Sequence, residues 1–105
     1  MTDTPMQEAV KRINEARELG EIGVDLFGLE IKEIPRELLE LADTLKWLEL
    51  SNTKVTDISS LANLTKLERL DLFYCPLDKS AANIQTLEKL IENGCEIYGV
   101  EEFMK

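Results

Sequence analysis

The stretch that decides the fold lies in the middle of the chain, where residues 45–66 read LKWLELSNTKVTDISSLANLTK. Its apolar residues stand at regular intervals: Leu45, Leu48, Leu50, Val55, Ile58, Leu61 and Leu64. A triplet with one acid between two apolar residues recurs along the chain, as Val24-Asp25-Leu26, Leu48-Glu49-Leu50, Leu70-Asp71-Leu72 and Cys95-Glu96-Ile97. Successive central acids are 24, 22 and 25 residues apart. Self-similarity at such a period predicts stacked units, each of which contributes one short strand.

The middle unit resembles the leucine-rich repeat of the internalin type, which has 22 residues, as residues 45–66 do. Its first three leucines take the strand-side positions, Thr53 takes the turn position that usually holds Asn, and the later apolar residues take the inward positions of the convex side. The preceding unit is similar to a bacterial variant of the repeat, with Ile31, Ile34-Pro35, Leu38 and Leu41. The resemblance covers about residues 21 to 100 and implies an α/β leucine-rich repeat solenoid. About four short parallel strands would form its concave face, with helices capping both ends.

A length of 105 residues fits a single domain. We expect residues 1–20 to form an N-terminal capping helix, residues 21–79 the repeats, and residues 80–105 a helix, the last strand and a cap. The first helix should begin at Thr4-Pro5-Met6-Gln7, which has the spacing of a capping box, and end at Gly20. The second helix is predicted between Asp78 or Ser80 and Asn93-Gly94 by an apolar stripe at Ala81, Ile84, Leu87, Leu90 and Ile91. The residues expected to fold over the last strand are Val100, Phe103 and Met104.

The composition argues against most kinds of chemistry. A formal net charge of −9 repels a phosphate backbone, so nucleic acid is not an expected partner. The absence of His removes the commonest general base and metal ligand, so we expect no enzyme activity, no metal and no cofactor. No stretch approaches the ~18 consecutive apolar residues of a membrane span, and the first residues lack a signal-peptide pattern. Cys75 and Cys95 lack metal-ligand spacing and should be free thiols in a reducing, cytoplasmic setting.

The candidate site is a set of acids on the outer face of the predicted strands. Because side chains alternate along a strand, the residue between the two inward apolar positions points to the concave surface. In all four units this residue is acidic: Asp25, Glu49, Asp71 and Glu96. Like charges on strands ~4.8 Å apart cost roughly 0.2–1 kcal/mol per pair, which favours a functional column of solvent-facing carboxylates. The alternative is that acids are common on a solvated face of a chain this acidic.

Aromatic side chains accompany the acids on the same face. The outward position two residues later holds Phe27, Ser51, Phe73 and Tyr98. The position two residues earlier holds Trp47 and Arg69, and Tyr74 ends its strand. Trp, Tyr and Arg supply most of the binding energy at protein interfaces, and carboxylates beside aromatic rings would select Lys or Arg. The alternative for the two phenylalanines is that they merely pack against each other along the sheet.

Two classes of function follow from this pattern. The first is a monomeric, non-enzymatic protein–protein interaction module that binds a basic peptide or protein surface through Asp25, Phe27, Trp47, Glu49, Arg69, Asp71, Phe73, Tyr74, Glu96 and Tyr98. The second is the recognition part of a larger bacterial effector or Roco-type signalling enzyme, because similar repeats occur in both. The Met1 start and the cap at the end of the sequence favour the first. A metal-binding acidic strip is a third, weaker option, since such a column lacks the carbonyl-rich loop that calcium prefers.

Overall fold

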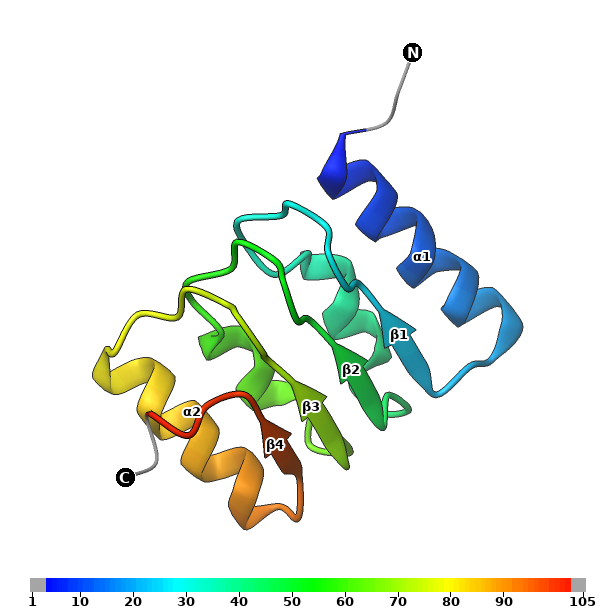
Figure 1. Ribbon diagram of the computed structural model, residues 1–105. Helices are drawn as coiled ribbons and strands as arrows, with labels where there is room; N and C mark the ends of the chain where they lie inside the picture. Colours follow the sequence, from blue (N-terminus) through cyan, green and yellow to red (C-terminus); the bar gives the residue numbers. More distant parts are fainter. Residues whose placement is uncertain (1–3, 103–105) are drawn as a thin grey trace.

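The computed structural model describes residues 4–102, and its four short strands form one parallel sheet in the order β1-β2-β3-β4 (Figure 1). Consecutive strands are neighbours, as the repeat pattern predicts. The elements in chain order are α1 (Pro5–Leu19), β1 (Gly23–Asp25), η1 (Arg36–Leu41), β2 (Trp47–Glu49), η2 (Ser59–Asn63), β3 (Arg69–Asp71), α2 (Ala81–Glu92) and β4 (Glu96–Tyr98), where η denotes a 3₁₀ helix.

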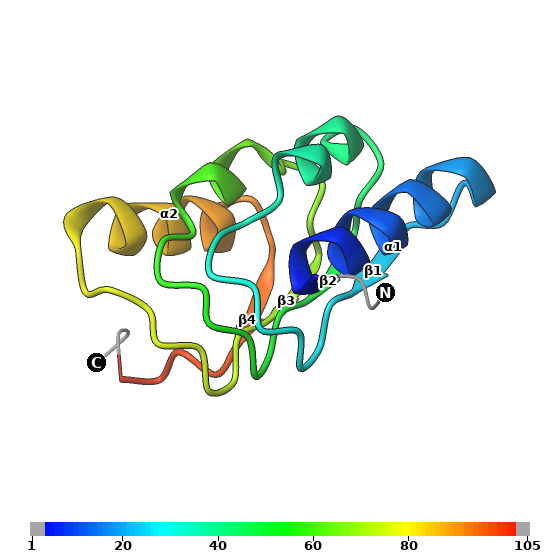
Figure 2. The same cartoon turned by 90° about the horizontal axis from the view of Figure 1, so that it is seen from above.

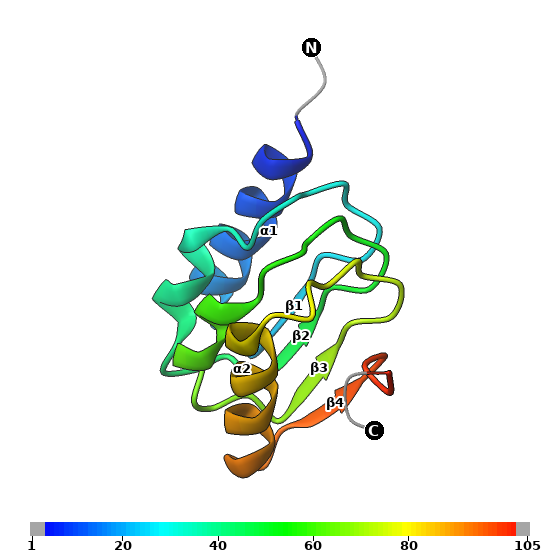
Figure 3. The same ribbon diagram turned by 90° about the vertical axis from the view of Figure 1, so that its left-hand side faces the viewer.

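Two layers make up the molecule, with the strands on one side and the helical segments η1, η2 and α2 on the other (Figures 2 and 3). The space between them is filled by the apolar residues of the repeats. In the middle unit all seven predicted inward residues are buried: Leu45, Leu48, Leu50, Val55, Ile58, Leu61 and Leu64. Each unit therefore buries its apolar side chains against the units before and after it, which is the energetic basis of a repeat fold.

Helix α1 begins and ends at the predicted residues. The Thr4 side chain accepts a hydrogen bond from the Gln7 backbone N–H, and the Gln7 side chain accepts one from the Thr4 backbone N–H. Gly20 ends the helix in the left-handed conformation, with φ of 68°. The helix lies beside β1 and η1, and it buries Ala9, Ile13 and Ala16.

Ser80 is the N-cap of helix α2, which resolves the choice between Ser80 and Asp78. Its buried face differs from the predicted stripe, because Ala81 is exposed and Ile91 is 43% exposed. The residues that face the core are Asn83, Thr86, Leu87 and Leu90. Hydrogen bonds explain why the helix turns a polar residue inward: the Asn83 side chain accepts from the Ile58 N–H at 2.9 Å and donates to two backbone carbonyls, those of Thr56 and Asp78.

The strands β1, β2 and β3 begin and end one residue earlier than expected, but their register is the predicted one, with Asp25, Glu49 and Asp71 side by side. The ladder continues past the strand ends, since the Leu26 N–H donates to the Glu49 carbonyl. The predicted inward positions Leu26, Leu50 and Leu72 are buried.

The register of the last strand differs from the prediction. Tyr98, not Glu96, pairs with Asp71, and Glu96 pairs with Arg69. The position beside Leu72 therefore falls on Gly99, whose backbone has a φ of 89°. A Cβ added there would lie 2.5 Å from the Phe73 backbone nitrogen, so only glycine fits. The register predicted from the triplet Cys95-Glu96-Ile97 is therefore wrong, because the longer helical connection through α2 displaces β4 by two residues.

The remaining expectations concern the thiols and the end of the chain. Cys75 and Cys95 are free thiols, as predicted. Val100 is buried, while Phe103 and Met104 lie outside the described residues.

We predict that Asn83→Ala lowers the free energy of unfolding by at least about 2 kcal/mol, because it takes their partner from the Ile58 N–H and the Asp78 carbonyl and removes one of the two hydrogen bonds that the Thr56 carbonyl accepts. Urea denaturation measures the effect. Gln85→Ala, on the exposed side of the same helix, is the control and should change stability little. Equal stability of the two variants would contradict a structural role for the Asn83 amide.

A second prediction concerns the contact of α1 with the first repeat. Ile13 is fully buried, so Ile13→Ala should cost about 2–5 kcal/mol of the free energy of unfolding. Leu19→Ala, which truncates an exposed side chain of the same helix, should cost far less. Thermal denaturation of both variants would show whether α1 supports the repeats or is an independent appendage.

Candidate functional site

The candidate site is the strand face, which we define as the outward side of β1–β4, away from η1, η2 and α2. The sheet register arranges its side chains in two rows. One row consists of Gly23, Trp47, Arg69 and Glu96, and the other consists of Asp25, Glu49, Asp71 and Tyr98. The predicted column of four carboxylates is thus a row of three, because the β4 register moves Glu96 beside Arg69.

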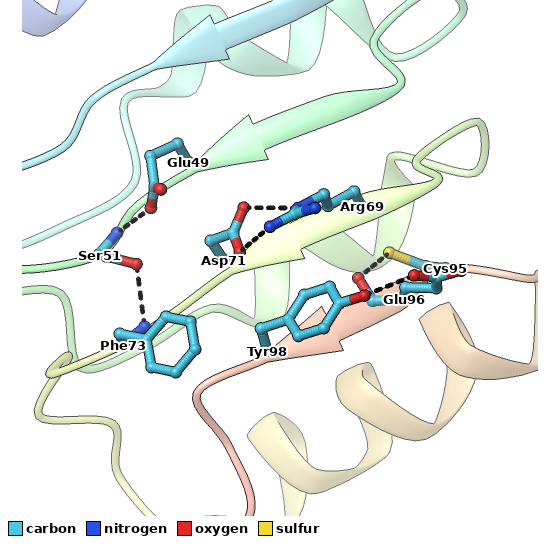
Figure 4. A network of polar contacts seen from close by, with 8 residues as sticks. All are labelled: Glu49, Ser51, Arg69, Asp71, Phe73, Cys95, Glu96 and Tyr98. Carbon is cyan, nitrogen blue, oxygen red and sulfur yellow. Dashed lines mark hydrogen bonds and ion pairs between the residues drawn. The ribbon is translucent and has the colours of Figure 1, made fainter.

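Asp71 is not solvent-facing, contrary to the expectation. Its residue is only 3% exposed, and Arg69 donates two hydrogen bonds to its carboxylate, from Nε at 3.1 Å and from Nη2 at 3.2 Å (Figure 4). This pairing also raises the pKa of Arg69. The charge of Asp71 is therefore compensated within its own strand, which removes much of the repulsion that a column of free carboxylates would create.

Tyr98 and Glu96 extend this network to the last strand. The guanidinium carbon of Arg69 lies 4.6 Å from the centre of the Tyr98 ring, within the range of a cation–π contact. The Tyr98 hydroxyl donates a hydrogen bond of 2.6 Å to the Glu96 carboxylate (Figure 4). That bond and the nearby negative charge of Glu96 raise the pKa of Tyr98.

Asp25 and Glu49 also have partners within the chain, so stability explains part of their presence. The Asp25 carboxylate accepts a hydrogen bond from the Phe27 N–H at 2.9 Å, and the Glu49 carboxylate accepts one from the Ser51 N–H at 2.7 Å. Both bonds close the turn that follows a strand. Asp25 nevertheless remains exposed and Glu49 half-buried, so both carboxylates are also accessible from the strand face.

Ser51 behaves differently from its neighbours in the predicted outward row. It is buried, and its hydroxyl accepts a hydrogen bond of 3.0 Å from the Phe73 N–H (Figure 4). After β1 and β2, the equivalent backbone N–H donates to the carboxylate of the last strand residue, Asp25 or Glu49. After β3 the Phe73 N–H donates to the Ser51 hydroxyl instead, since the Asp71 carboxylate is paired with Arg69. Ser51 is therefore a structural residue of the turn and contributes no accessible group.

The aromatic residues differ in how far they are exposed. Trp47 is half-buried and lies over Gly23, where an added Cβ would come within 2.3 Å of its ring. Phe27 and Phe73 are 52% and 42% exposed. Phe73 makes its ring contact with Tyr74, at 6.4 Å between centroids and a tilt of 44°. The two phenylalanines follow β1 and β3, with the β2 repeat between them, so mutual packing does not account for their position.

Tyr74 has an uncommon backbone conformation. It lies in the left-handed region, with φ of 60°. The equivalent positions after β1 and β2 are Gly28 and Asn52, which are residue types that adopt this conformation readily. The spacing of the repeats would have revealed this position from the sequence, because Gly28, Asn52 and Tyr74 each follow the central acid by three residues.

Two thiols lie close to the site without being activated. The Cys75 thiol donates to the Leu50 carbonyl at 3.0 Å, and its sulfur lies 3.4 Å from the hydroxyl of Thr53, 22 residues earlier in the chain. Burial raises the pKa of Cys75, and burial together with the charge of Glu96 raises that of Cys95 to about 11. Such thiols are poor nucleophiles at neutral pH.

Three other features were possible between residues 4 and 102: a metal site, a reactive Asp57 and a membrane-spanning helix. No group of three His, Cys, Asp or Glu side chains there could hold a metal ion. Asp57 accepts hydrogen bonds from the Ser59 N–H and hydroxyl, which lower the pKa of its carboxyl, so it serves the start of η2. Of the helices in this part of the chain, none is long and apolar enough to cross a membrane.

Comparison with known families agrees with this geometry. Residues 43–89 match the family described as Leucine Rich repeats (2 copies). The match supports a leucine-rich repeat protein and is limited to this segment. It includes β2, η2, β3 and most of α2, and thus the central part of the strand face. No curated protein matches the chain. Leucine-rich repeats generally mediate protein–protein interaction and are typically not enzymes.

The ion pair between buried Asp71 and half-exposed Arg69 gives a stability prediction. Asp71→Ala should lower the free energy of unfolding by about 1–3 kcal/mol, because it removes the acceptor of two charge-assisted hydrogen bonds. Chemical denaturation measures the loss. Glu68→Ala is the control, since its carboxylate is exposed and lies 3.9 Å from the exposed ammonium of Lys46. If Glu68→Ala were destabilised and Asp71→Ala were not, the Arg69–Asp71 pair would not contribute to stability.

The Tyr98–Glu96 bond gives a spectroscopic prediction. The chain has two tyrosines, so Tyr74→Phe leaves Tyr98 as the only one. In this background Glu96→Gln should lower the pKa of Tyr98, because the negative charge that disfavours the tyrosinate is gone. Ultraviolet absorbance during an alkaline titration reports the change. An unchanged titration curve would mean that Tyr98 and Glu96 are not in contact.

Proposed function

We propose that this chain is a non-enzymatic recognition module that binds a basic peptide or protein surface through its strand face. The proposal rests on one observation: Phe27, Phe73 and Tyr74 expose aromatic rings directly after β1 and β3, in a sheet whose strands also carry accessible carboxylates. Large apolar side chains exposed together on a rigid surface are typical of protein interaction sites. The interaction role that leucine-rich repeats generally have supports the same proposal.

Charge defines the kind of partner. Asp71 is compensated by Arg69, but Asp25, Glu49 and Glu96 have no cation bonded to their carboxylates among the described residues. These three charges lie on a chain with a formal net charge of −9. A partner that presents Lys or Arg would gain favourable contacts at each of the three, whereas an acidic partner would be repelled.

The test exploits the difference between an acid and its amide. Asp25→Asn, Glu49→Gln and Glu96→Gln together keep an oxygen acceptor for the three local hydrogen bonds and remove three negative charges. We expect the triple variant to fold as the unaltered chain does, and to bind a fluorescein-labelled octa-arginine peptide at least about tenfold more weakly. Fluorescence polarisation at several salt concentrations measures both the affinity and its salt dependence, which should become shallower in the variant.

The matched control removes the same number of charges from the opposite side of the sheet. Glu37→Gln, Glu88→Gln and Glu92→Gln lie on η1 and α2, and this second triple variant should bind nearly as the unaltered chain does. If both triple variants lost affinity equally, binding would depend on net charge alone and not on the strand face. If only the control lost affinity, the binding surface would lie on the helical side.

A further inference from the structure

Phe73 and Tyr74 follow β3 and form a pair of exposed aromatic rings that internal hydrogen bonds and burial do not explain. We propose that their two rings form an anchor for an arginine side chain of the partner, so that the module prefers arginine to lysine. This inference rests on the proposed function and adds to it the identity of the cationic group.

The backbone of Tyr74 carries a cost that the neighbouring repeats avoid. The left-handed region is unfavourable for residues other than glycine, because their Cβ comes too close to the following carbonyl oxygen, and Asn is among the few that tolerate it. The first repeat places Gly28 at this position and the second places Asn52. An aromatic residue in the third repeat is therefore unfavourable for the turn itself, and its presence needs another explanation.

Folding does not offset that cost through burial. The Tyr74 residue is 81% exposed, the most exposed of the large apolar and aromatic residues that the structure describes. Its ring contact is with Phe73, which is itself 42% exposed. The two rings thus support each other at the end of β3 while their outer surfaces remain in solvent. Backbone strain retained beside an exposed side chain is a feature of binding sites.

The chemistry of the face favours a guanidinium group over an ammonium group. A guanidinium is planar and weakly hydrated, so it stacks on an aromatic ring more readily than the compact, strongly hydrated ammonium of lysine. The strand face already contains one such contact, between Arg69 and the Tyr98 ring. Carboxylates alone would attract either cation. A preference for arginine over lysine would therefore depend on the aromatic rings and not on the carboxylates.

The experiment compares two labelled peptides of equal charge, octa-arginine and octa-lysine, on the full chain and three variants. Tyr74→Asn introduces the residue of the second repeat, Tyr74→Phe keeps the ring, and the amide triple variant removes the acids. We expect the unaltered chain to bind octa-arginine about fivefold more tightly than octa-lysine. Tyr74→Asn should abolish this ratio, Tyr74→Phe should keep it, and the amide variant should weaken both peptides while it retains the ratio.

Thermal denaturation of the same proteins tests the strain argument. Tyr74→Asn should melt at or above the temperature of the unaltered chain, because the left-handed backbone is easier for Asn. A lower melting temperature would mean that Tyr74 is structural and would overturn the inference. Equal binding of both peptides by the unaltered chain and by Tyr74→Asn would also overturn it. In that case the proposed function would still stand if the amide variant lost affinity. If neither peptide bound the unaltered chain, both proposals would fall.

Discussion

The structure depends on one constraint: no repeat can bury its own apolar side chains. Each strand has three residues, too few to be stable alone, and the inward leucines are covered only by the units on either side. This requires the strands to be parallel and in register, since a slip of one residue would turn every inward leucine outward. The same requirement places the outward residues of neighbouring strands about 4.8 Å apart. The strand face is therefore a consequence of how the core is packed.

How much of the fold the sequence predicts depends on whether the signal is local. Leucine spacing predicts the inward residues and the register of β1–β3, and the capping sequence at Thr4 predicts where α1 begins. For α2 the sequence leaves Asp78 and Ser80 as alternatives, of which the structure has Ser80. The register of β4 depends instead on the length of the connection through α2 and on the close approach of Gly99 to Phe73. Neither is visible in the triplet Cys95-Glu96-Ile97. The inward position of Asn83 is also nonlocal, because its partners include the backbone of Thr56 and Ile58.

For the candidate site, the sequence predicts which side chains point outward but not how they interact. Alternation along the strands correctly places Glu49, Arg69 and Tyr98 on one face. It does not reveal that Arg69 neutralises Asp71, because an arginine two residues before an acid could equally point away from it. It also does not reveal that Asp25 closes a turn through the Phe27 N–H. An acidic row that suggests repulsion is in fact partly a set of internal hydrogen bonds.

These internal bonds change what the acids contribute to recognition. A carboxylate that already accepts a backbone hydrogen bond is held in one orientation, so less conformational entropy is lost when a cation binds to it. The carboxylates of Asp25 and Glu49 thus combine a structural role with a fixed presentation of charge. The rings of Phe73 and Tyr74 make no comparable contribution to the fold, since they are exposed and one of them strains its backbone. Under the proposed function, the acids would attract any basic partner, and discrimination between cations would come from the rings.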